Sequence, residues 1–453
     1  MSVDPAVGLG TDAPEPASAP LDVPHAAGPP RAVPTAAAPS STGSPRLPRR
    51  PIRARGGLLH LLGPAFVASI AYVDPGNVAA NLTAGSRYGY LLLWVLVAAD
   101  VIAVLVQYQS ARLGLVTGRS LPEVLGDRMP RGGRLAFWVQ AEVVAGATDL
   151  AEVVGGALAL QLLFDLPLAL GGLIVGVVSL VLLATQDRYG QRRFELVVAA
   201  LLAVIGLGFL AGLAVRPPDA AGVLHGLVPH FAGTDSVLLA ASMLGATVMP
   251  HAIYVHSALA RDRHGHLGTG AARTRLLRAT RWDVGGALAA AGVVNIGLLL
   301  LAATGLRHVP GTDSIPGAHA AIVASLGTAV GLAFAIGLLA SGLASTSVGA
   351  YAGSVVMDGL LHRRVPPLVR RTVTLVPAVV LLALGADPTW TLVVSQVVLS
   401  FGIPFALVPL VRLTRDERLM GAERTGPWLN AVLLTVVGLV VALNVALLVL
   451  LLR

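Results

Sequence analysis

Two short strings of the sequence combine side chains that can bind a cation with residues that interrupt a helix. Residues 74–77 read Asp-Pro-Gly-Asn and residues 249–251 read Met-Pro-His, both within long apolar stretches. Proline removes a backbone donor and glycine relaxes the restriction on φ, so each string breaks a helix. Unwound backbone inside a membrane is tolerated only where it is buried in protein or lines a cavity. Both strings therefore mark candidate binding positions.

The strongest candidate ligand is the carboxylate of Asp74, which costs about 2.5–3.5 kcal/mol to place in the middle of a membrane. Asn77 and freed carbonyls around Ala71 offer an oxygen cage, and Met249 and the carbonyl of Ala246 add ligands from the second string. Oxygens with one thioether suit Mn²⁺ or Fe²⁺, whereas Ca²⁺ and Mg²⁺ prefer oxygen throughout. Alternatively, Asp74 only caps a broken helix and Met249 only fills the core.

A second group of ionisable residues lies in the apolar stretch 134–163. Glu142, Asp149 and Glu152 are spaced by two turns and one turn, so they share one helix face. Acids in a membrane need cations or protons, and Arg370 and Arg371 at the start of a later stretch are natural partners. The group is interpreted as a proton relay, with a static ion-pair network as the alternative.

Two histidines lie in or just after the second string. His251 comes directly after its proline, and imidazole titrates near neutral pH, so we interpret it as a proton switch beside the cation site. His256, nearer the end of the same stretch, is a weaker candidate. The alternative for both is a hydrogen-bonded packing role. The chain has no cysteine, which excludes thiolate ligands and disulfides.

The composition requires that lipid is the solvent for most of this chain. Of its 453 residues, 55% are hydrophobic and 12% are charged, with a mean hydropathy of +0.77, whereas soluble proteins carry about 25% charged residues. We predict an all-α membrane protein with eleven transmembrane segments, at about 58–84, 90–112, 134–163, 168–185, 194–215, 236–260, 283–306, 318–357, 371–386, 389–411 and 429–452. Glycines at 342, 349 and 353 predict a tilt or a kink in the eighth of these segments.

Arginine gathers in every second loop, and the alternate loops are nearly bare of it. This pattern predicts a multi-pass protein of the bacterial plasma membrane with a cytoplasmic N-terminus and an external C-terminus. The formal net charge of +8 follows the loops and not one face, which argues against nucleic acid. Residues 1–55, rich in proline and alanine with a basic end, are predicted to be a disordered cytoplasmic tail before a polytopic transporter domain at 56–453.

The interrupted segments are the first and the sixth, five apart. Two broken helices at corresponding positions of two five-helix halves predict a five-plus-five inverted repeat with discontinuous helices 1 and 6 and a central site.

Residues 74–77, 147–152 and 246–251 together resemble the Nramp family of proton-coupled divalent metal ion transporters, of the bacterial manganese type. The likeness covers the chain from about residue 56 to its end. It implies symport of Mn²⁺ or Fe²⁺ with protons, without a cofactor. By this resemblance the metal ligands are Asp74, Asn77, Met249, Ala71 and Ala246, and the proton path runs through His251, Asp149, Glu152 and Arg371, with Arg370 and Glu142 nearby.

One position departs from the family pattern. Many members carry a glutamine in helix ten that can reach the metal, and the matching position is interpreted as Gly402. A water molecule, or Gln396 from earlier in the same segment, would then have to serve.

Three other functions are considered. An organic-solute symporter of the same fold, for example for amino acids, would place a substrate carboxylate beside anionic Asp74, which would repel it. An intramembrane metalloenzyme would need a motif such as His-Glu-x-x-His, which the sequence lacks, so we predict no enzyme activity. The loops are too short for the folded soluble domain of a sensor, and no obligate protein partner is predicted.

Overall fold

The computed structural model describes residues 63–189, 191–265, 268–363, 365 and 367–451. The tail predicted at 1–55 lies outside these residues. Helices account for nearly all of the described chain. In chain order they are α1 (Pro64–Ser69), the 3₁₀ turn η2 (Ile70–Val73), α2 (Pro75–Tyr88), α3 (Leu93–Thr117), α4 (Leu121–Arg128), α5 (Arg131–Phe164), α6 (Leu168–Tyr189), α7 (Gln191–Val215), α8 (Ala220–Gly226), α9 (Thr234–Thr247), α10 (Pro250–His264), α11 (Ala271–Gly305), α12 (Ile315–Leu326), α13 (Thr328–Leu361), α14 (Pro367–Ala383), α15 (Pro388–Arg415), α16 (Glu417–Met420), the 3₁₀ turn η3 (Gly421–Glu423) and α17 (Pro427–Leu451).

The helices have the exposure pattern of a protein surrounded by lipid. Large apolar side chains such as Leu207 and Leu384 are 74% and 77% exposed, while Asp74 is fully buried. Within the described residues, seven helices are long and apolar enough to cross a membrane, and four shorter apolar helices accompany them. The polar interior and apolar exterior confirm the predicted all-α membrane fold, and the count of eleven crossings stays a prediction.

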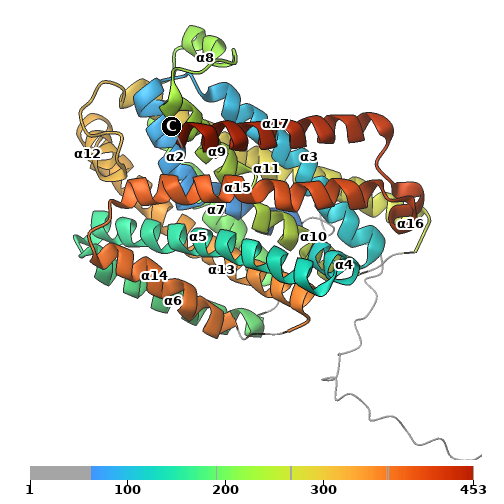
Figure 1. Ribbon diagram of the computed structural model, residues 1–453. Helices are drawn as coiled ribbons and strands as arrows, with labels where there is room; N and C mark the ends of the chain where they lie inside the picture. The colour runs from blue at the N-terminus through green and yellow to red at the C-terminus, as the bar shows by residue number, and fades with distance from the viewer. Residues whose placement is uncertain (1–62, 190, 266–267, 364, 366, 452–453) are drawn as a thin grey trace, which may run out of the picture. The chain divides into compact units, whose positions relative to one another are not determined.

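Short connecting helices separate into two groups at opposite ends of the bundle. Figure 1 shows α4 and α16 together at one end, and α12 at the other. An ion pair of 2.7 Å between Arg128 and Asp416 links α4 to the turn before α16. The loops before the third and eleventh predicted segments therefore lie on the same side, as an even number of crossings between them requires.

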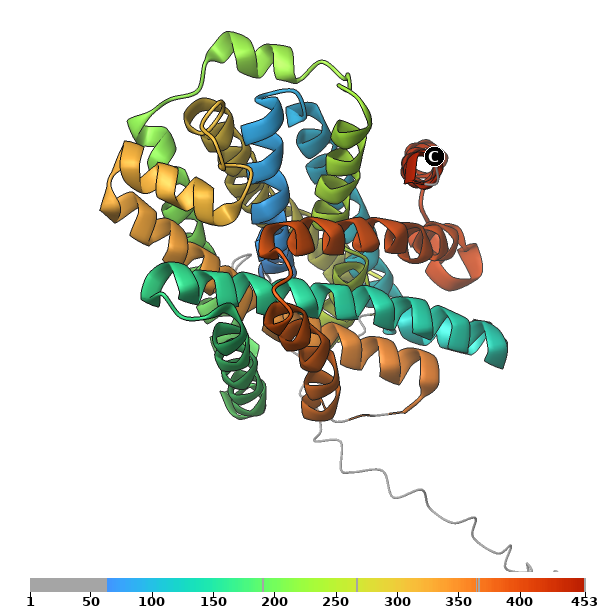
Figure 2. The same cartoon turned by 60° about the vertical axis from the view of Figure 1, so that its left-hand side comes forward.

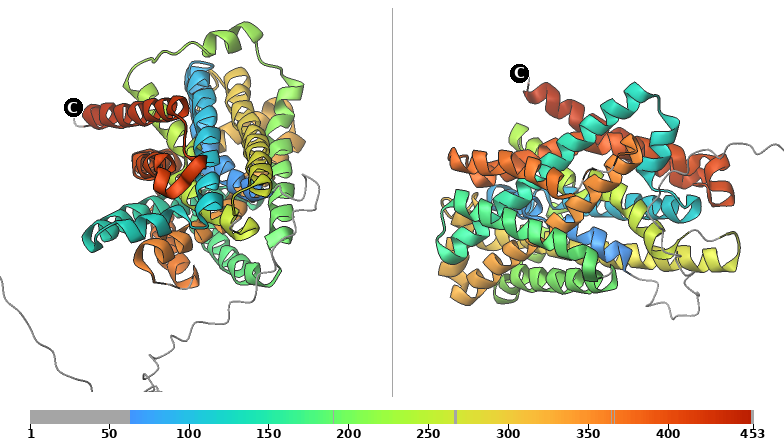
Figure 3. Two further views of the ribbon diagram at one scale, coloured as in Figure 1. Left: turned by 90° about the vertical axis from the view of Figure 1, so that its right-hand side faces the viewer. Right: turned by 90° about the horizontal axis from the view of Figure 1, so that it is seen from below.

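Helix α17 lies at the edge of the bundle, as Figures 2 and 3 show, and packs on α15 and α9. Helix α15 in turn contacts α5, α2 and α10, so it connects the edge with both interrupted helices. Its N-cap Asp387 accepts a hydrogen bond from the Trp390 amide at 2.6 Å, which satisfies a donor left free at the helix start.

The glycines predicted to interrupt the eighth segment lie inside a continuous helix, and the tilt or kink of that segment stays a prediction. Helix α13 runs without interruption through residues 342, 349 and 353, and the chain breaks earlier, at Gly327, whose φ of 95° ends α12. The three glycines instead give room to neighbours. A Cβ atom at Gly353 would lie 1.8 Å from the Arg370 guanidinium, and one at Gly349 would lie 3.0 Å from Glu152 Oε1. Small residues here permit close contact between helices.

Candidate functional site

The first broken helix turns at Asp74. Helix α1 tightens into η2, Asp74 adopts an extended conformation (φ −75°, ψ 167°), and α2 begins at Pro75. Asp74 Oδ1 accepts hydrogen bonds from the backbone N–H and the side-chain Nδ2 of Asn77, both at 2.7 Å. The carboxylate thus caps α2 at its positive end, where a negative charge is stabilised.

The two breaks are built alike and meet directly. Proline at 75 and at 250 cannot donate to the carbonyl four residues earlier, which belongs to Ala71 in one helix and to Ala246 in the other. Asn77 Nδ2 bridges the two breaks, because it also donates to the Ala246 carbonyl at 3.0 Å.

Met249 stands at the N-cap of α10 and is fully buried. The carboxylate, the amide, the Ala246 carbonyl and the start of α10 therefore converge between α2 and α10.

Gln396 of α15 approaches this site from the side. Its Nε2 lies 3.4 Å from Asp74 Oδ2. Two glycines make the approach possible, since a Cβ at Gly76 would lie 1.7 Å from Gln396 Nε2 and one at Gly245 would lie 2.0 Å from the Gln396 carbonyl oxygen. Gly402 lies elsewhere, against side chains of α5 and α10. The structure therefore puts residue 396, and not residue 402, beside Asp74.

Two oxygen atoms at the site have unused acceptor capacity. Among the described residues, Asn77 Oδ1 and Gln396 Oε1 are buried without a hydrogen-bond partner. A buried acceptor without a donor is costly, and a cation would satisfy it. No group of three or more His, Cys, Asp or Glu side chains in the described chain could hold a metal, so a site here relies on one carboxylate and neutral donors.

A separate ion-pair cluster joins α5 to α14. Arg371 Nη1 lies 2.5 Å from Asp149 Oδ1 and 3.1 Å from Glu152 Oε2, and all three side chains are almost completely buried. Thr346 of α13 and Ser179 of α6 accept further hydrogen bonds from the guanidinium, each at 3.2 Å. Side chains from three helices therefore hold this arginine of α14 in place.

Arg370 forms a second pair, with Glu142, at 3.2 Å. The Glu142 side chain is 21% exposed, against 2% for Asp149 and 0% for Glu152. The ion pairs expected between the two arginines and the acids of the third segment are thus present. The pairs of Arg371 are buried, and the pair of Arg370 with Glu142 is partly exposed.

The two histidines have different neighbours. His251 Nδ1 lies 3.3 Å from Thr148 Oγ1, next to Asp149, so it joins the second break to α5. His256 Nδ1 lies 2.8 Å from Gln107 Oε1 on α3, and Gln107 Nε2 donates to the Tyr72 hydroxyl at 2.5 Å. His256 therefore contacts the first broken helix through α3, away from the acids.

Buried polar residues that the sequence reasoning missed support the first break. Asn295 of α11 donates to the Tyr72 carbonyl at 2.6 Å and accepts from Asn81 at 3.1 Å, and Ser341 donates to the Val73 carbonyl at 2.5 Å. Asp283 accepts from the backbone amides at 63 and 65, at 3.1 Å each, and so fixes the start of α1. An amide or acid inside an apolar segment is the signal that would have found them.

A helical membrane protein in which two interrupted helices meet around a buried carboxylate is a transporter of the inverted-repeat class. The family model described as natural resistance-associated macrophage protein-like matches residues 65–450. The chain belongs to this family, the Nramp family of membrane transporters, which are not enzymes.

Relatives and solved structures agree with this assignment. The divalent metal cation transporter MntH of Mycobacterium tuberculosis is 62% identical over 383 residues, 84% of this chain and 90% of that protein. MntH of Bacillus subtilis is 45% identical over 405 residues, 88% and 94% of the two chains. The Eremococcus coleocola manganese transporter, solved with an aromatic bis-isothiourea compound, has a TM-score of 0.78 at 30% identity and 85% coverage of each chain.

A more distant structure shares the fold alone. MhsT in complex with L-phenylalanine has a TM-score of 0.57 at 15% identity, over 85% of this chain and 97% of that one. The chain thus has the five-plus-five inverted repeat with discontinuous helices 1 and 6.

Proposed function

We propose that this protein carries divalent transition-metal cations, Mn²⁺ and Fe²⁺, into the cell together with protons. The observation that carries the proposal is Asp74, a fully buried carboxylate whose hydrogen-bond partners are all neutral. A buried charge without a counter-ion is unfavourable, so this carboxylate requires a cation. The relatives named as divalent metal cation transporters support a metal as that cation.

In the proposed site Asp74, Asn77 and Met249 bind the metal with the carbonyls of Ala71 and Ala246. Gln396 supplies a further oxygen, because its Oε1 is unpartnered and its amide already faces Asp74. A thioether contributes to binding of Mn²⁺ and Fe²⁺ but not of Ca²⁺ or Mg²⁺, so Met249 serves as a filter.

Protons take a different route in this proposal. They pass from the metal site by His251 to Asp149 and Glu152, and then to Arg371 with the Glu142–Arg370 pair beyond it. Two buried carboxylates share the single Arg371 guanidinium, so one negative charge is left that a proton can neutralise.

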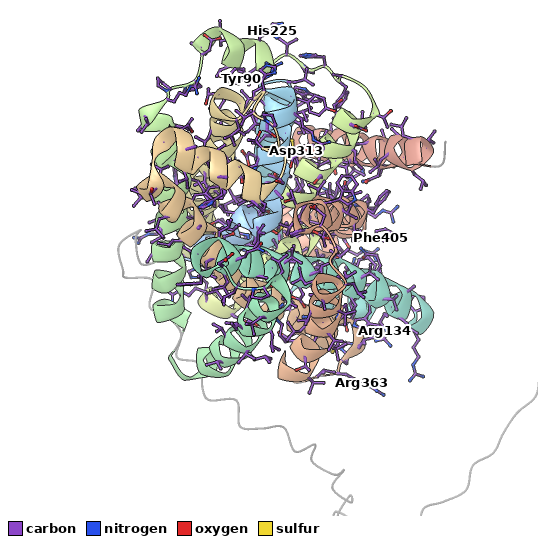
Figure 4. The ribbon with its side chains drawn as sticks, turned by 90° about the vertical axis from the view of Figure 1, so that its left-hand side faces the viewer. Tyr90, Arg134, His225, Asp313, Arg363 and Phe405 are labelled. Carbon is purple, nitrogen blue, oxygen red and sulfur yellow. The ribbon has the colours of Figure 1, made fainter. Side chains whose placement is uncertain are left out.

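The metal enters, we propose, from the outer end of the bundle, where α12 lies and the C-terminal helix ends. A cavity of ≈ 380 Å³ at the end of α2 is lined by Asp235, Asp313 and Asp387 with Arg87 (Figure 4 labels Asp313). Three acids and one base give this mouth a net negative charge, which raises the local concentration of cations.

The test is uptake of radioactive manganese into proteoliposomes, with and without an inward proton gradient. We expect saturable uptake that the gradient accelerates and that Fe²⁺ competes away. A gradient-independent uptake would remove proton coupling from the proposal. Uptake of an amino acid, with none of manganese, would favour the organic-solute alternative.

A further inference from the structure

A small cavity lies between α5, α10 and α13, beside the residues considered so far. Its volume is ≈ 10 Å³, and its walls include Gln140, Glu142, His251 and Tyr254. About 10–15 Å³ is what one water molecule requires, provided that it finds two to four polar partners. The cavity therefore has room for a single water and for nothing larger.

The walls of this cavity carry polar atoms that no described residue satisfies. Tyr254 is 2% exposed, and its hydroxyl has no hydrogen-bond partner in the described chain; the same holds for Gln140 Oε1. Arg370 lies over Gly353, a wall residue, and its Nη2 is likewise buried and unpartnered. Unsatisfied buried polar groups are rare in proteins because each costs about 1–3 kcal/mol.

The donors and acceptors match the bonding capacity of water. Arg370 Nη2 and the Tyr254 hydroxyl can donate, and Gln140 Oε1 can accept. A water molecule accepts two hydrogen bonds and donates two, so it satisfies all three groups and keeps one donor free. Glu142 forms another part of the wall and is the only acid of the α5 group with a substantial exposed fraction, 21%.

We propose that this cavity binds one ordered water molecule, held by Tyr254, Gln140 and Arg370, and that this water passes protons to Glu142. The transfer of protons to Glu142 rests on the proposed proton-coupled function, whereas the binding of the water does not. The water takes up one proton from its inner side as it releases another to the Glu142 carboxylate, so its own charge is restored. The charged and titratable groups around Glu142 are Arg370 from α14, His251 and Tyr254 from α10, and Asp149 on α5 itself.

The water itself is tested without any transport. The full-length protein in nanodiscs is exposed to a short hydroxyl-radical pulse in ¹⁸O-labelled water, and oxidation of single tyrosines is followed by mass spectrometry. Tyr72 is the matched control, because it is also 2% exposed but its hydroxyl is bound to Gln107. We expect Tyr254 to be oxidised several-fold faster than Tyr72, and equal rates would overturn the water site.

The role of this water is tested by proton influx into proteoliposomes. Tyr254→Phe and Gln140→Leu each remove a partner of the water, so proton influx should fall several-fold while manganese binding is unchanged. Ala145→Val narrows the same cavity and should act alike, which keeps the test decisive if one variant misfolds. Tyr108→Phe, outside the cavity, should behave as wild type. Full proton influx in the first three variants would overturn the role of the water in proton transfer. A wild-type protein that moves no protons would instead refute the proposed function, and the labelling result for the water site would still hold.

Discussion

The molecule buries carboxylates in two places and treats them differently. Asp74 receives hydrogen bonds only from amides, two from Asn77 and a longer one from Gln396. Asp149 and Glu152 instead share the guanidinium of Arg371, which is fixed by hydroxyl groups of two further helices. No positively charged side chain of the described residues bonds to Asp74, whereas Asp149 and Glu152 are paired with Arg371.

This difference between the two sites suits them to different cations, a metal ion at one and a proton at the other. A metal ion needs several oxygen or sulfur ligands, and Asn77 and Gln396, each with an unpartnered side-chain oxygen, contact Asp74. Near Arg371 a metal would meet an immobile positive charge at a distance of a few ångströms, where repulsion in a buried setting is strong. A proton needs only one lone pair, which the pair of acids still offers. In the proposed function, metal therefore binds at the helix breaks and protons at the α5–α14 cluster.

The largest effect is expected from removing the negative charge at the proposed metal site. Asp74→Asn keeps the size and the capping oxygen but removes the negative charge. Manganese uptake into proteoliposomes should fall at least about 100-fold, which corresponds to ~2.7 kcal/mol. Asp165→Asn, at an exposed helix end, is the control and should transport normally. Near-normal uptake by the Asp74 variant would place the metal elsewhere.

Removing the positive charge of Arg371 should lower the stability of the fold as well as slow transport. Arg371→Met leaves two buried acids without their partner, at a cost of about 3–5 kcal/mol, because an uncompensated buried charge remains. Thermal unfolding in detergent, followed by size-exclusion chromatography, should show a lower midpoint. The triple variant that adds Asp149→Asn and Glu152→Gln should recover most of the loss. An unchanged midpoint in the single variant would mean that the acids are already protonated.

Glu152→Gln sharpens the division of roles between the sites. The change keeps the size and hydrogen-bonding capacity but prevents titration. Manganese affinity, measured by calorimetry, should change less than about threefold, or ~0.7 kcal/mol, while proton influx reported by a trapped dye falls sharply. Glu417→Gln on the exposed α16 is the control. Loss of metal binding with full proton flux would show that Glu152 is a ligand.

At the thioether the expected effect concerns the choice of cation more than the rate of manganese uptake. Met249→Ala should weaken manganese uptake about tenfold or less, ~1.4 kcal/mol, and should allow Ca²⁺ to compete, since sulfur selects against hard cations. Met243→Ala, from an equally buried methionine of α9, is the matched control. It should lower stability without changing selectivity. If calcium stays excluded from the Met249 variant, the carbonyls and amides set the selectivity.

The sequence was sufficient where a single residue type forces a local outcome. Proline at 75 and at 250 cannot donate a hydrogen bond, so both breaks could be predicted to within a residue. The ion pairs of Arg370 and Arg371 followed from the cost of isolated charges in lipid.

Other features depend on how helices approach each other, which local pattern does not record. Gln396 reaches Asp74 because Gly76 and Gly245 let α15 come close. The sequence offered Gln396 only as an alternative to a water molecule, because no pattern near residue 396 records this close approach. The glycines of α13 were interpreted as interruptions that tilt or kink the helix. A single sequence does not distinguish a glycine that makes its own helix flexible from one that lets a neighbouring helix pack closely.

The Arg371 cluster also constrains how the protein is made. Glu152 and Arg371 are 219 residues apart, so at about 5–20 residues per second the acids of α5 precede their arginine by roughly 10–40 s. During that interval each acid in the bilayer is either protonated or penalised by several kcal/mol. Helix α14, with two arginines at its start, is in turn poorly inserted without those acids. A chain that ends before residue 370 therefore keeps the two buried acids of α5 without the arginine that pairs with them.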